Sequence, residues 1–233
     1  MTLGHLDPPA SPIQSPATDS VANGPEMGRR QRRAAETRIR LFRCALALFA
    51  ERGFSNVTVE EITEAADVGK GTFFNYFQSK EHVLGVMAEI QQGKVAEAVA
   101  MAGEGKRTIH EVLRHLSQRA AEEPGRSPEL ARALISSFLA SEAVRGIIRR
   151  EMAKGRMMLA EIIATGQKSG EIDPALKKEK LATHLLQTFM GTVLFWSLHE
   201  EPPLSVWMED SFRHFWRAIA VPGHESGREP GRK

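Results

Sequence analysis

The chain has 233 residues, of which 42% are hydrophobic and 26% are charged. These shares are close to the average for soluble globular proteins and exclude a collagen-like or mostly disordered chain, while the length suits one large domain or two small ones. The single cysteine, Cys44, excludes an internal disulfide and a cysteine-based zinc finger, so the reducing cytoplasm is the expected location.

Both ends of the chain are predicted to be disordered. Residues 1–28 are rich in Pro, Ser and Gly and hold almost nothing apolar, and residues 222–233 have the same character. The first ten residues have neither a basic nor an apolar region typical of a signal peptide, so we expect no export.

A strongly basic segment opens the expected ordered region. Residues 29–43, RRQRRAAETRIRLFR, hold seven Arg and one Glu, a local charge of +6 that leaves −4 for the rest of a chain with net charge +2. A positive segment on a slightly acidic body is typical of a protein that binds DNA at one end. The alternative is a solvated, charged start of a helix.

Apolar residues recur at helical spacing along the ordered region, and no run of strict alternation predicts a strand. The sequence therefore predicts an all-α fold with about nine helices. Helix starts are indicated by the capping boxes Thr58/Glu61 and Thr108/Glu111 and by Pro behind a capping residue at 127–128 and 173–174. The expected spans are 34–52, 58–66, 69–76, 79–102, 107–122, 128–139, 141–169, 174–200 and 205–220.

Residues 58–80 have the spacing of a helix-turn-helix, with a tight turn at Asp67-Val68. Phe73 and Phe77, four residues apart, are predicted to anchor the second helix from behind, so that its outer face is free to enter a major groove. The outer face is expected to carry side chains able to bind base edges or phosphates, which are Lys70, Thr72, Asn75 and Tyr76.

Residues 36–84, ETRIRLFRCALALFAERGFSNVTVEEITEAADVGKGTFFNYFQSKEHVL, resemble the DNA-binding domain of the tetracycline-repressor (TetR) family of bacterial transcriptional regulators. The resemblance rests on the FAERGF end of the first helix, the Thr-x-x-x-Ile of the second, and Gly-Thr-Phe-x-x-Tyr-Phe-x-x-Lys in the third. The stretch from Gly166 to Ile172, with Gly191 and Trp196, is similar to the family's regulatory domain.

The resemblance implies a role for each matching residue. Lys70, Gly71 and Thr72, with Asn75 on the same face, are implied to meet bases or nearby backbone. Phosphate contacts are implied for Thr58, Tyr76 and Lys80, and a basic arm reaching the duplex for Arg29, Arg30, Arg32 and Arg33.

Three positions depart from the family pattern. Phe74 stands where Tyr is common, which removes a hydroxyl that would touch phosphate. Asp67 replaces a common Gly at the turn, where Asp tolerates the left-handed conformation. Gly69 stands where Ser often caps the third helix.

The remaining ordered residues are expected to form a second helical domain over 86–221, after a DNA-binding domain with its arm over 29–85. Residues 181–199 carry no Asp, Glu, Lys or Arg, but their many polar side chains favour a buried helix over a membrane span. A helix apolar around most of its circumference needs cover on both sides. The resemblance implies a homodimer through the last two helices, with candidate interface residues Phe189, Phe195, Phe212, Phe215 and Trp216.

The resemblance also implies a small-molecule effector, as yet unidentified, that releases DNA. Polar groups on otherwise apolar helices, with large apolar neighbours, are the candidates for a pocket that takes a small hydrophobic molecule. They are Phe138, Met157, Met158, His184, Gln187, Thr188 and Trp196, although each is also compatible with an ordinary core or interface position.

The alternatives are a constitutive or architectural DNA-binding protein and an α-helical enzyme. The segment GEGKRT at 103–108 lacks the first Gly and the preceding strand of a phosphate loop. His110 and His115 are five apart, which does not place them on one helical face for a metal. We expect no enzymatic activity, no cofactor and no metal site.

Overall fold

The computed structural model describes residues 28–199 and 201–223. The chain divides into two units, Met1–Glu36 and Thr37–Lys233. In the first unit the described residues are 28–36, most of which belong to the start of helix α1. The predicted disordered ends, 1–28 and 222–233, lie outside the described residues except for Gly28, Pro222 and Gly223.

The described residues form nine α-helices, two short 3₁₀ turns and no β-strand, which confirms the predicted fold class. One isolated β-bridge joins Ile172 and Ala220. The elements in chain order are α1 (Arg29–Arg52), η1 (Phe54–Asn56), α2 (Val59–Ala65), α3 (Lys70–Phe74), α4 (Lys80–Glu104), α5 (Ile109–Ala120), η2 (Pro124–Arg126), α6 (Pro128–Ala140), α7 (Glu142–Lys168), α8 (Lys178–His199) and α9 (Leu204–Ile219).

The predicted caps are formed at three of four helix starts. Thr58 and Thr108 each close a capping box with the Glu three residues on, and Ser127 accepts from Leu130 N at 3.1 Å with Pro128 in the first turn. The start predicted at Pro174 is wrong, because Asp173 accepts a hydrogen bond from Ala175 N at 2.8 Å in a local turn and α8 begins at Lys178.

Two other boundaries differ from expectation. Helix α1 begins at Arg29, five residues earlier than predicted, so the basic segment is helical. Helix α3 is shorter than predicted and ends at Phe74, and its last backbone groups are satisfied by Tyr76 N and Phe77 N donating to Phe73 O at 2.9 Å.

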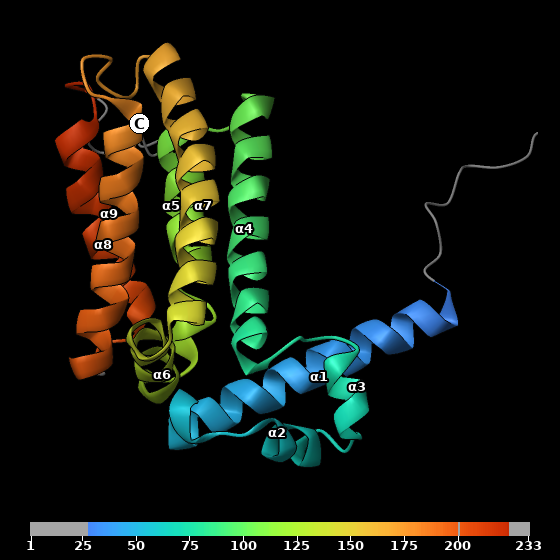
Figure 1. The fold of residues 1–233 in the computed structure, drawn as a ribbon. Helices are drawn as coiled ribbons and strands as arrows, with labels where there is room; N and C mark the ends of the chain where they lie inside the picture. Colours follow the sequence, from blue (N-terminus) through green and yellow to red (C-terminus); the bar gives the residue numbers. More distant parts are fainter. Residues whose placement is uncertain (1–27, 200, 224–233) are drawn as a thin grey trace, which may run out of the picture. The chain divides into compact units, whose positions relative to one another are not determined.

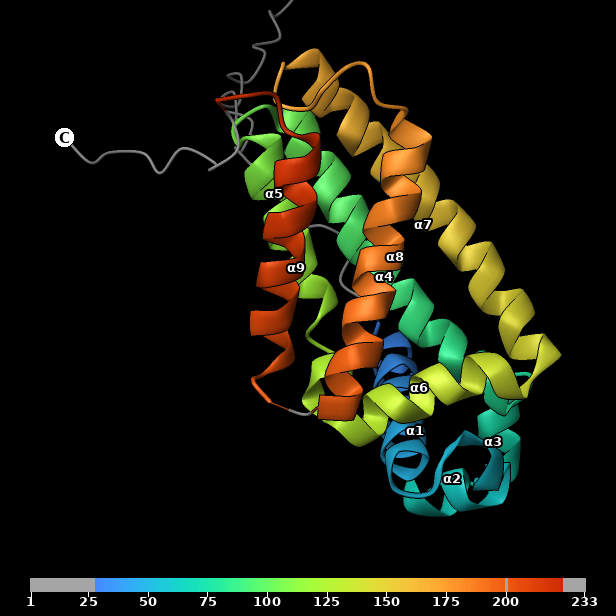
Figure 2. The ribbon, with the colours of Figure 1, turned by 90° about the vertical axis from the view of Figure 1, so that its left-hand side faces the viewer.

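The long helices α4, α5, α7, α8 and α9 stand side by side in a bundle (Figures 1 and 2), with α4 against α7 and α5, and α8 between α7 and α9. Their inner faces form one hydrophobic core, whose fully buried side chains include Trp216, Phe212, Leu113, Leu159 and Ile162. Burial of these side chains supplies most of the driving force for the bundle.

A second hydrophobic core joins the helix-turn-helix to the near end of the bundle. It gathers Phe49, Ile62 and Phe73 with Leu84 from the start of α4 and Leu134 from α6, which lies across that end (Figures 1 and 2). Helix α4 thus contributes to both cores, with Leu84 in the second and Ala98 in the first. The division between the two cores falls inside this helix.

Candidate functional site

The turn between α2 and α3 positions the candidate DNA-binding helix. Thr58 Oγ1 accepts from Glu61 N at 3.2 Å, and Thr58 N donates to Glu61 Oε2 at 2.8 Å, so the start of α2 is closed. Asp67 has a φ of 49°, the left-handed conformation that the turn requires. Val68 N donates to Thr63 O at 3.0 Å, which ends α2 and directs the chain into α3.

Helix α3 is held by one face and exposed on the other. Phe73 is fully buried, with its ring centroid 5.3 Å from that of Phe77, as the spacing predicted. Phe74 is 49% exposed, and its ring meets that of Phe73 edge to face, with the centroids 5.4 Å apart. The outer face carries Lys70, Gly71, Phe74 and Asn75, all exposed. These four residues are therefore free to meet a major groove.

Lys70 is held in an ion pair by Glu60 of α2. The hydrogen bond from Lys70 lowers the pKa of the Glu60 carboxyl below its ordinary value. Both side chains are exposed, so a DNA phosphate or guanine edge competes with Glu60 for the ammonium group in an environment where such pairs contribute little.

Packing inside the protein does not require a glycine at position 71. A Cβ atom built on it meets nothing within 4 Å, and its φ is not in the left-handed range. Thr72 and Tyr76 are half-buried, and Tyr76 packs against the second core. The hydroxyl of Thr58 is engaged in its capping box, so a phosphate would meet mainly the backbone of α2 there.

Lys80 is placed differently from the sequence expectation. Its Nζ donates to Phe54 O at 2.9 Å and Val57 O at 2.8 Å, and lies 4.7 Å from the centroid of the Phe54 ring. These contacts give Lys80 a structural role at the end of η1. Its phosphate contact stays a prediction without support from this geometry.

The predicted arm residues lie in the first turns of α1. Arg29, Arg30, Arg32 and Arg33 are all exposed, and Arg32 N donates to Gly28 O at 3.1 Å. They form a regular helix start with a high density of positive charge. Such a segment attracts a polyanion without regard to sequence.

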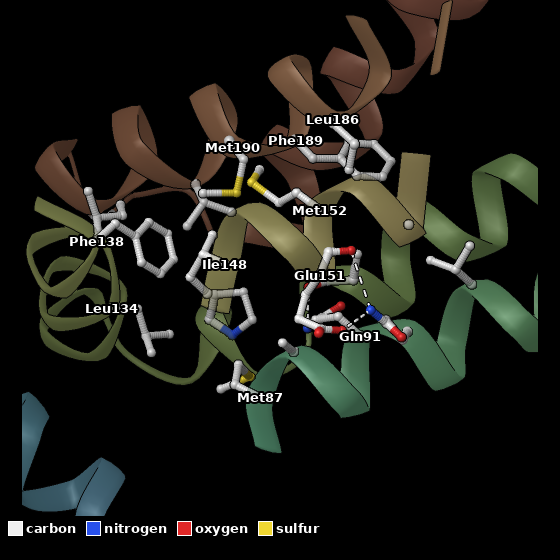
Figure 3. A pocket seen from close by; sticks show the side chains of 18 of the residues that line it. Met87, Gln91, Leu134, Phe138, Ile148, Glu151, Met152, Leu186, Phe189 and Met190 are labelled. Atoms are coloured by element: carbon white, nitrogen blue, oxygen red, sulfur yellow. Dashed lines mark hydrogen bonds between the residues drawn. The ribbon is translucent and has the colours of Figure 1, made fainter. Parts of the chain in front are cut away.

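A cavity of about 210 Å³ lies between the helices of the bundle (Figure 3). Its walls are largely apolar and come from α4, α6, α7 and α8, with contributions from α5, η2 and α9. Three of the lining side chains are amides or carboxylates, Gln91 and Gln92 of α4 and Glu151 of α7. An apolar cavity with a few convergent polar groups is typical of a small-molecule site.

Most of the predicted ligand residues lie outside this cavity. Phe138 lines it, and the other six do not. Met157 is 64% exposed, His184 and Gln187 are exposed, and Met158 and Thr188 are half-buried elsewhere. Trp196 is in the core and its Nε1 donates to Pro202 O at 3.0 Å. The sequence signal that could have predicted this cavity is the pair Gln91-Gln92 among the apolar residues of α4, because two adjacent amides are unusual in a helix that only packs in a core.

Three predicted interface residues are likewise corrected. Phe212 and Trp216 are each 1% exposed and Phe189 is buried, because their helices turn these faces toward α5 and the cavity. They belong to the core of one chain. Phe215 is half-buried against that core, and Phe195 is 57% exposed. Three other large apolar side chains of α8 and α9 are also exposed, which are Leu194, Leu198 and Val206.

Helix α8 is, among the described residues, the one long and apolar enough to cross a membrane by length and composition. Of the most apolar 18-residue stretch of α8, 44% is buried inside the chain. The rest of this stretch leaves apolar side chains that the chain itself does not bury.

These features define a helix-turn-helix protein with an exposed recognition helix and a helical domain that encloses an apolar cavity. The family model for bacterial regulatory proteins of the tetR family matches residues 41–87. Over these residues, from within α1 to the start of α4, the chain is similar to the TetR family of regulators.

Two curated relatives are also regulators. The chain is 49% identical over 69 residues to the HTH-type transcriptional regulator TcmR of Streptomyces glaucescens, a match that spans 30% of either chain. It is 25% identical over 149 residues to the repressor DhaR of Mycobacterium sp. strain GP1, which covers 63% of this chain and 75% of that one.

A solved structure shares the whole architecture. The repressor FadR of Thermus thermophilus, crystallised in complex with lauroyl-CoA, is 28% identical, with a TM-score of 0.58 over 84% of this chain and 99% of that one.

Proposed function

We propose that this chain is a cytoplasmic transcriptional repressor that binds a palindromic operator as a homodimer and is released by a small, largely apolar effector. One observation carries the proposal: the core that holds the exposed recognition helix and the wall of the apolar cavity have residues in common. Leu84 and Leu134 belong to the core that holds α3 and also line the cavity.

The charge distribution supports DNA binding through α1 and α3 together. Residues 58–80 contain four acidic and two basic residues, and one of the two, Lys80, is engaged with backbone carbonyls. The long-range attraction to phosphates therefore comes from the arginines of residues 29–43. The neutral and polar groups on α3 supply base preference at short range.

The shared wall explains how a ligand could change DNA binding. Packed cores have little free volume, so a ligand that fills or widens the cavity moves Leu84 and Leu134 against their neighbours. A ligand that binds one arrangement of α4 better shifts the population toward it. In this mechanism the favoured arrangement places the two recognition helices of a dimer off the half-site spacing.

FadR of Thermus thermophilus, a repressor of this fold crystallised with lauroyl-CoA, supports control by a small-molecule ligand. The cavity also favours effector control over the alternative of a constitutive or architectural DNA-binding protein, since such a protein has no use for an apolar cavity of about 210 Å³ with polar groups in its wall.

The test is selection of bound duplexes from a random DNA pool, followed by binding of the winner at several salt concentrations. We expect a palindrome and an affinity that falls steeply with salt. Lys70→Ala should relax preference at one position of each half-site, with a loss of about 1–3 kcal/mol. Gly71→Ala should fold normally, because its Cβ points into open space, yet weaken operator binding by holding α3 away from the groove.

Gly93→Ala is the matched control for Gly71→Ala. Gly93 is exposed on α4, its added Cβ also meets nothing within 4 Å, and it lies far along the chain from α3. Both variants should gain up to about 1 kcal/mol of helix stability, and operator binding should fall in Gly71→Ala alone. Recovery of no enriched sequence from the pool would contradict the proposal.

A further inference from the structure

The cavity has one kind of charge in its wall. Among its described lining residues Glu151 is the charged one, and neither Lys, Arg nor His lines it. Taking the cavity as the effector site of the proposed function, we propose that its ligand is a lipophilic amine, bound as a monocation with its ammonium group at Glu151.

The polar groups form a corner of the cavity instead of being spread around it. Gln92 Nε2 donates to Glu151 O at 3.3 Å and also to the Glu151 carboxylate. Gln91 Nε2 donates to Glu123 Oε2 at 3.1 Å. In Figure 3, Gln91 and Glu151 lie together, apart from Phe138 and Leu134 at the left. A ligand therefore finds its polar contacts at one place and an apolar surface elsewhere.

The lysines near the Glu151 carboxylate do not line the cavity. Lys94 is buried, but its Nζ is held by Glu123 and by Glu122 at 3.2 Å. Lys154 Nζ lies 2.9 Å from Glu151 Oε1, and this side chain is 56% exposed. Glu151 is only 20% exposed, whereas Lys154 is the exposed partner, so the Lys154 ammonium can return to water when a ligand cation takes its place.

An anionic ligand meets the opposite situation. A carboxylate or phosphate in the cavity would face Glu151 without a described cation in the wall, where the shielding effect of water is reduced. A neutral ligand gains a hydrogen bond at this corner but not the stronger charge-assisted one. The charge of the wall therefore favours an amine over an alcohol and disfavours an acid.

The apolar remainder sets the size and shape. The apolar part of the wall includes Met152, Leu186, Phe189 and Met190 (Figure 3). Methionine side chains adapt to aromatic or aliphatic surfaces. A volume of about 210 Å³ is smaller than most drug-sized sites, which span about 300–1,000 Å³, so a body of two aromatic rings is a suitable probe.

The experiment compares three probes of equal size by titration calorimetry at neutral pH: biphenylmethylamine, biphenylmethanol and biphenylcarboxylate. We expect the amine to bind the wild-type protein about tenfold tighter than the alcohol, and the carboxylate to bind weakest. Equal or tighter binding of the carboxylate, or no binding of the amine at millimolar concentration, would overturn the proposal.

Three variants test the role of Glu151. Glu151→Gln keeps an acceptor for Gln92 but removes the charge, so the amine should lose its advantage while the alcohol binds as before. Lys154→Gln removes the competing cation and should tighten amine binding. Glu161→Gln on the same helix, whose carboxylate pairs with Lys178 at 3.2 Å and does not line the cavity, is the control and should change neither affinity.

Release of operator DNA distinguishes this proposal from the proposed function on which it rests. If the amine binds through Glu151 but leaves operator binding unchanged, effector control fails and the ligand class stands. If the alcohol or the carboxylate releases DNA and Glu151→Gln has no effect on amine binding, effector control stands and the ligand class is wrong.

Discussion

The ammonium group of Lys80 lies among backbone carbonyls, 2.9 Å from Phe54 O and 2.8 Å from Val57 O, and over the Phe54 ring. Phe54 begins the short turn η1 between α1 and α2, Val57 follows this turn, and Lys80 is the first residue of α4. The Lys80 side chain therefore links the start of α4 to the segment that precedes α2.

We expect Lys80→Met to destabilise the fold by about 2 kcal/mol, because charge-assisted hydrogen bonds to partly buried carbonyls are lost. Urea unfolding measures the loss. Lys106→Met is the control, since Lys106 is exposed and pairs with Glu104 alone. The folded fraction of the Lys80→Met variant should bind the operator with the affinity of the wild type. Unchanged stability with uniformly weaker DNA binding would instead assign Lys80 to a phosphate.

At the residue scale, local spacing predicted the buried side of α3 correctly but did not show the contacts that Lys80 makes with the backbone of residues 54 and 57. Phe73 and Phe77 are four residues apart, so helical geometry alone places them on one face. The partners of Lys80 lie 23 and 26 residues earlier in the chain. No local pattern shows that their carbonyls face the ammonium group.

The start of α5 is closed by a residue from another element. Glu171 follows α7 and is buried, and its carboxylate accepts from Ile109 N at 2.8 Å and His110 N at 3.2 Å. A carboxylate at a helix N-terminus satisfies free N–H groups and interacts favourably with the helix dipole. Close by, a Cβ on Gly166 in the last turn of α7 would lie 2.7 Å from Ile172 Cδ1 and 3.0 Å from Ile109 Cγ2, so this turn has little room for a larger residue.

We predict that Glu171→Ala destabilises the protein by about 3 kcal/mol, because two N–H groups lose their acceptor in a buried site. Glu171→Gln, which retains one acceptor, should lose less. Both are measured by urea unfolding. Glu97→Ala, which removes an exposed carboxylate 3.7 Å from Arg119, serves as control and should stay within about 0.5 kcal/mol of wild type.

Helix boundaries followed the sequence where caps are local and departed from it where the chain is tied at a distance. Thr58 and Thr108 cap through residues three positions away. The Asp173 region is held instead by its N–H donating to Ile219 O at 2.9 Å and by Gln167 Nε2 donating to Leu176 O at 2.7 Å. These ties keep residues 173–176 out of α8 and place its start at Lys178.

At the scale of the whole molecule, α8 and α9 carry large apolar side chains that the chain itself leaves exposed to solvent. Phe195 and Leu198 of α8 are 57% and 63% exposed, and Leu194 of α8 and Val206 of α9 are exposed as well. Large exposed apolar side chains grouped on two helices are typical of a protein interface. It is the surface through which we expect two chains to associate about a two-fold axis.

We expect the double variant Phe195→Asp, Leu198→Asp to be monomeric in sedimentation velocity while the wild type is a dimer, since a two-fold axis brings the new charges together in apolar surroundings. Operator affinity should fall by two orders of magnitude or more, since one half-site binds alone. Met157→Asp, an exposed apolar position on α7, should remain a dimer. A dimeric double variant would place the interface elsewhere.

The sequence by itself determined the all-α class, the helix-turn-helix and the buried side of its second helix. These follow from interactions between residues a few positions apart, which helical periodicity and capping rules describe. The tertiary structure alone decided which faces of α8 and α9 are inside the chain, and therefore that Phe212 and Trp216 are core residues. It also decided that Gln91 of α4 and Glu151 of α7 share a cavity. Packing between helices sets both, because the pattern of a single helix shows that a face is apolar but does not show what covers it.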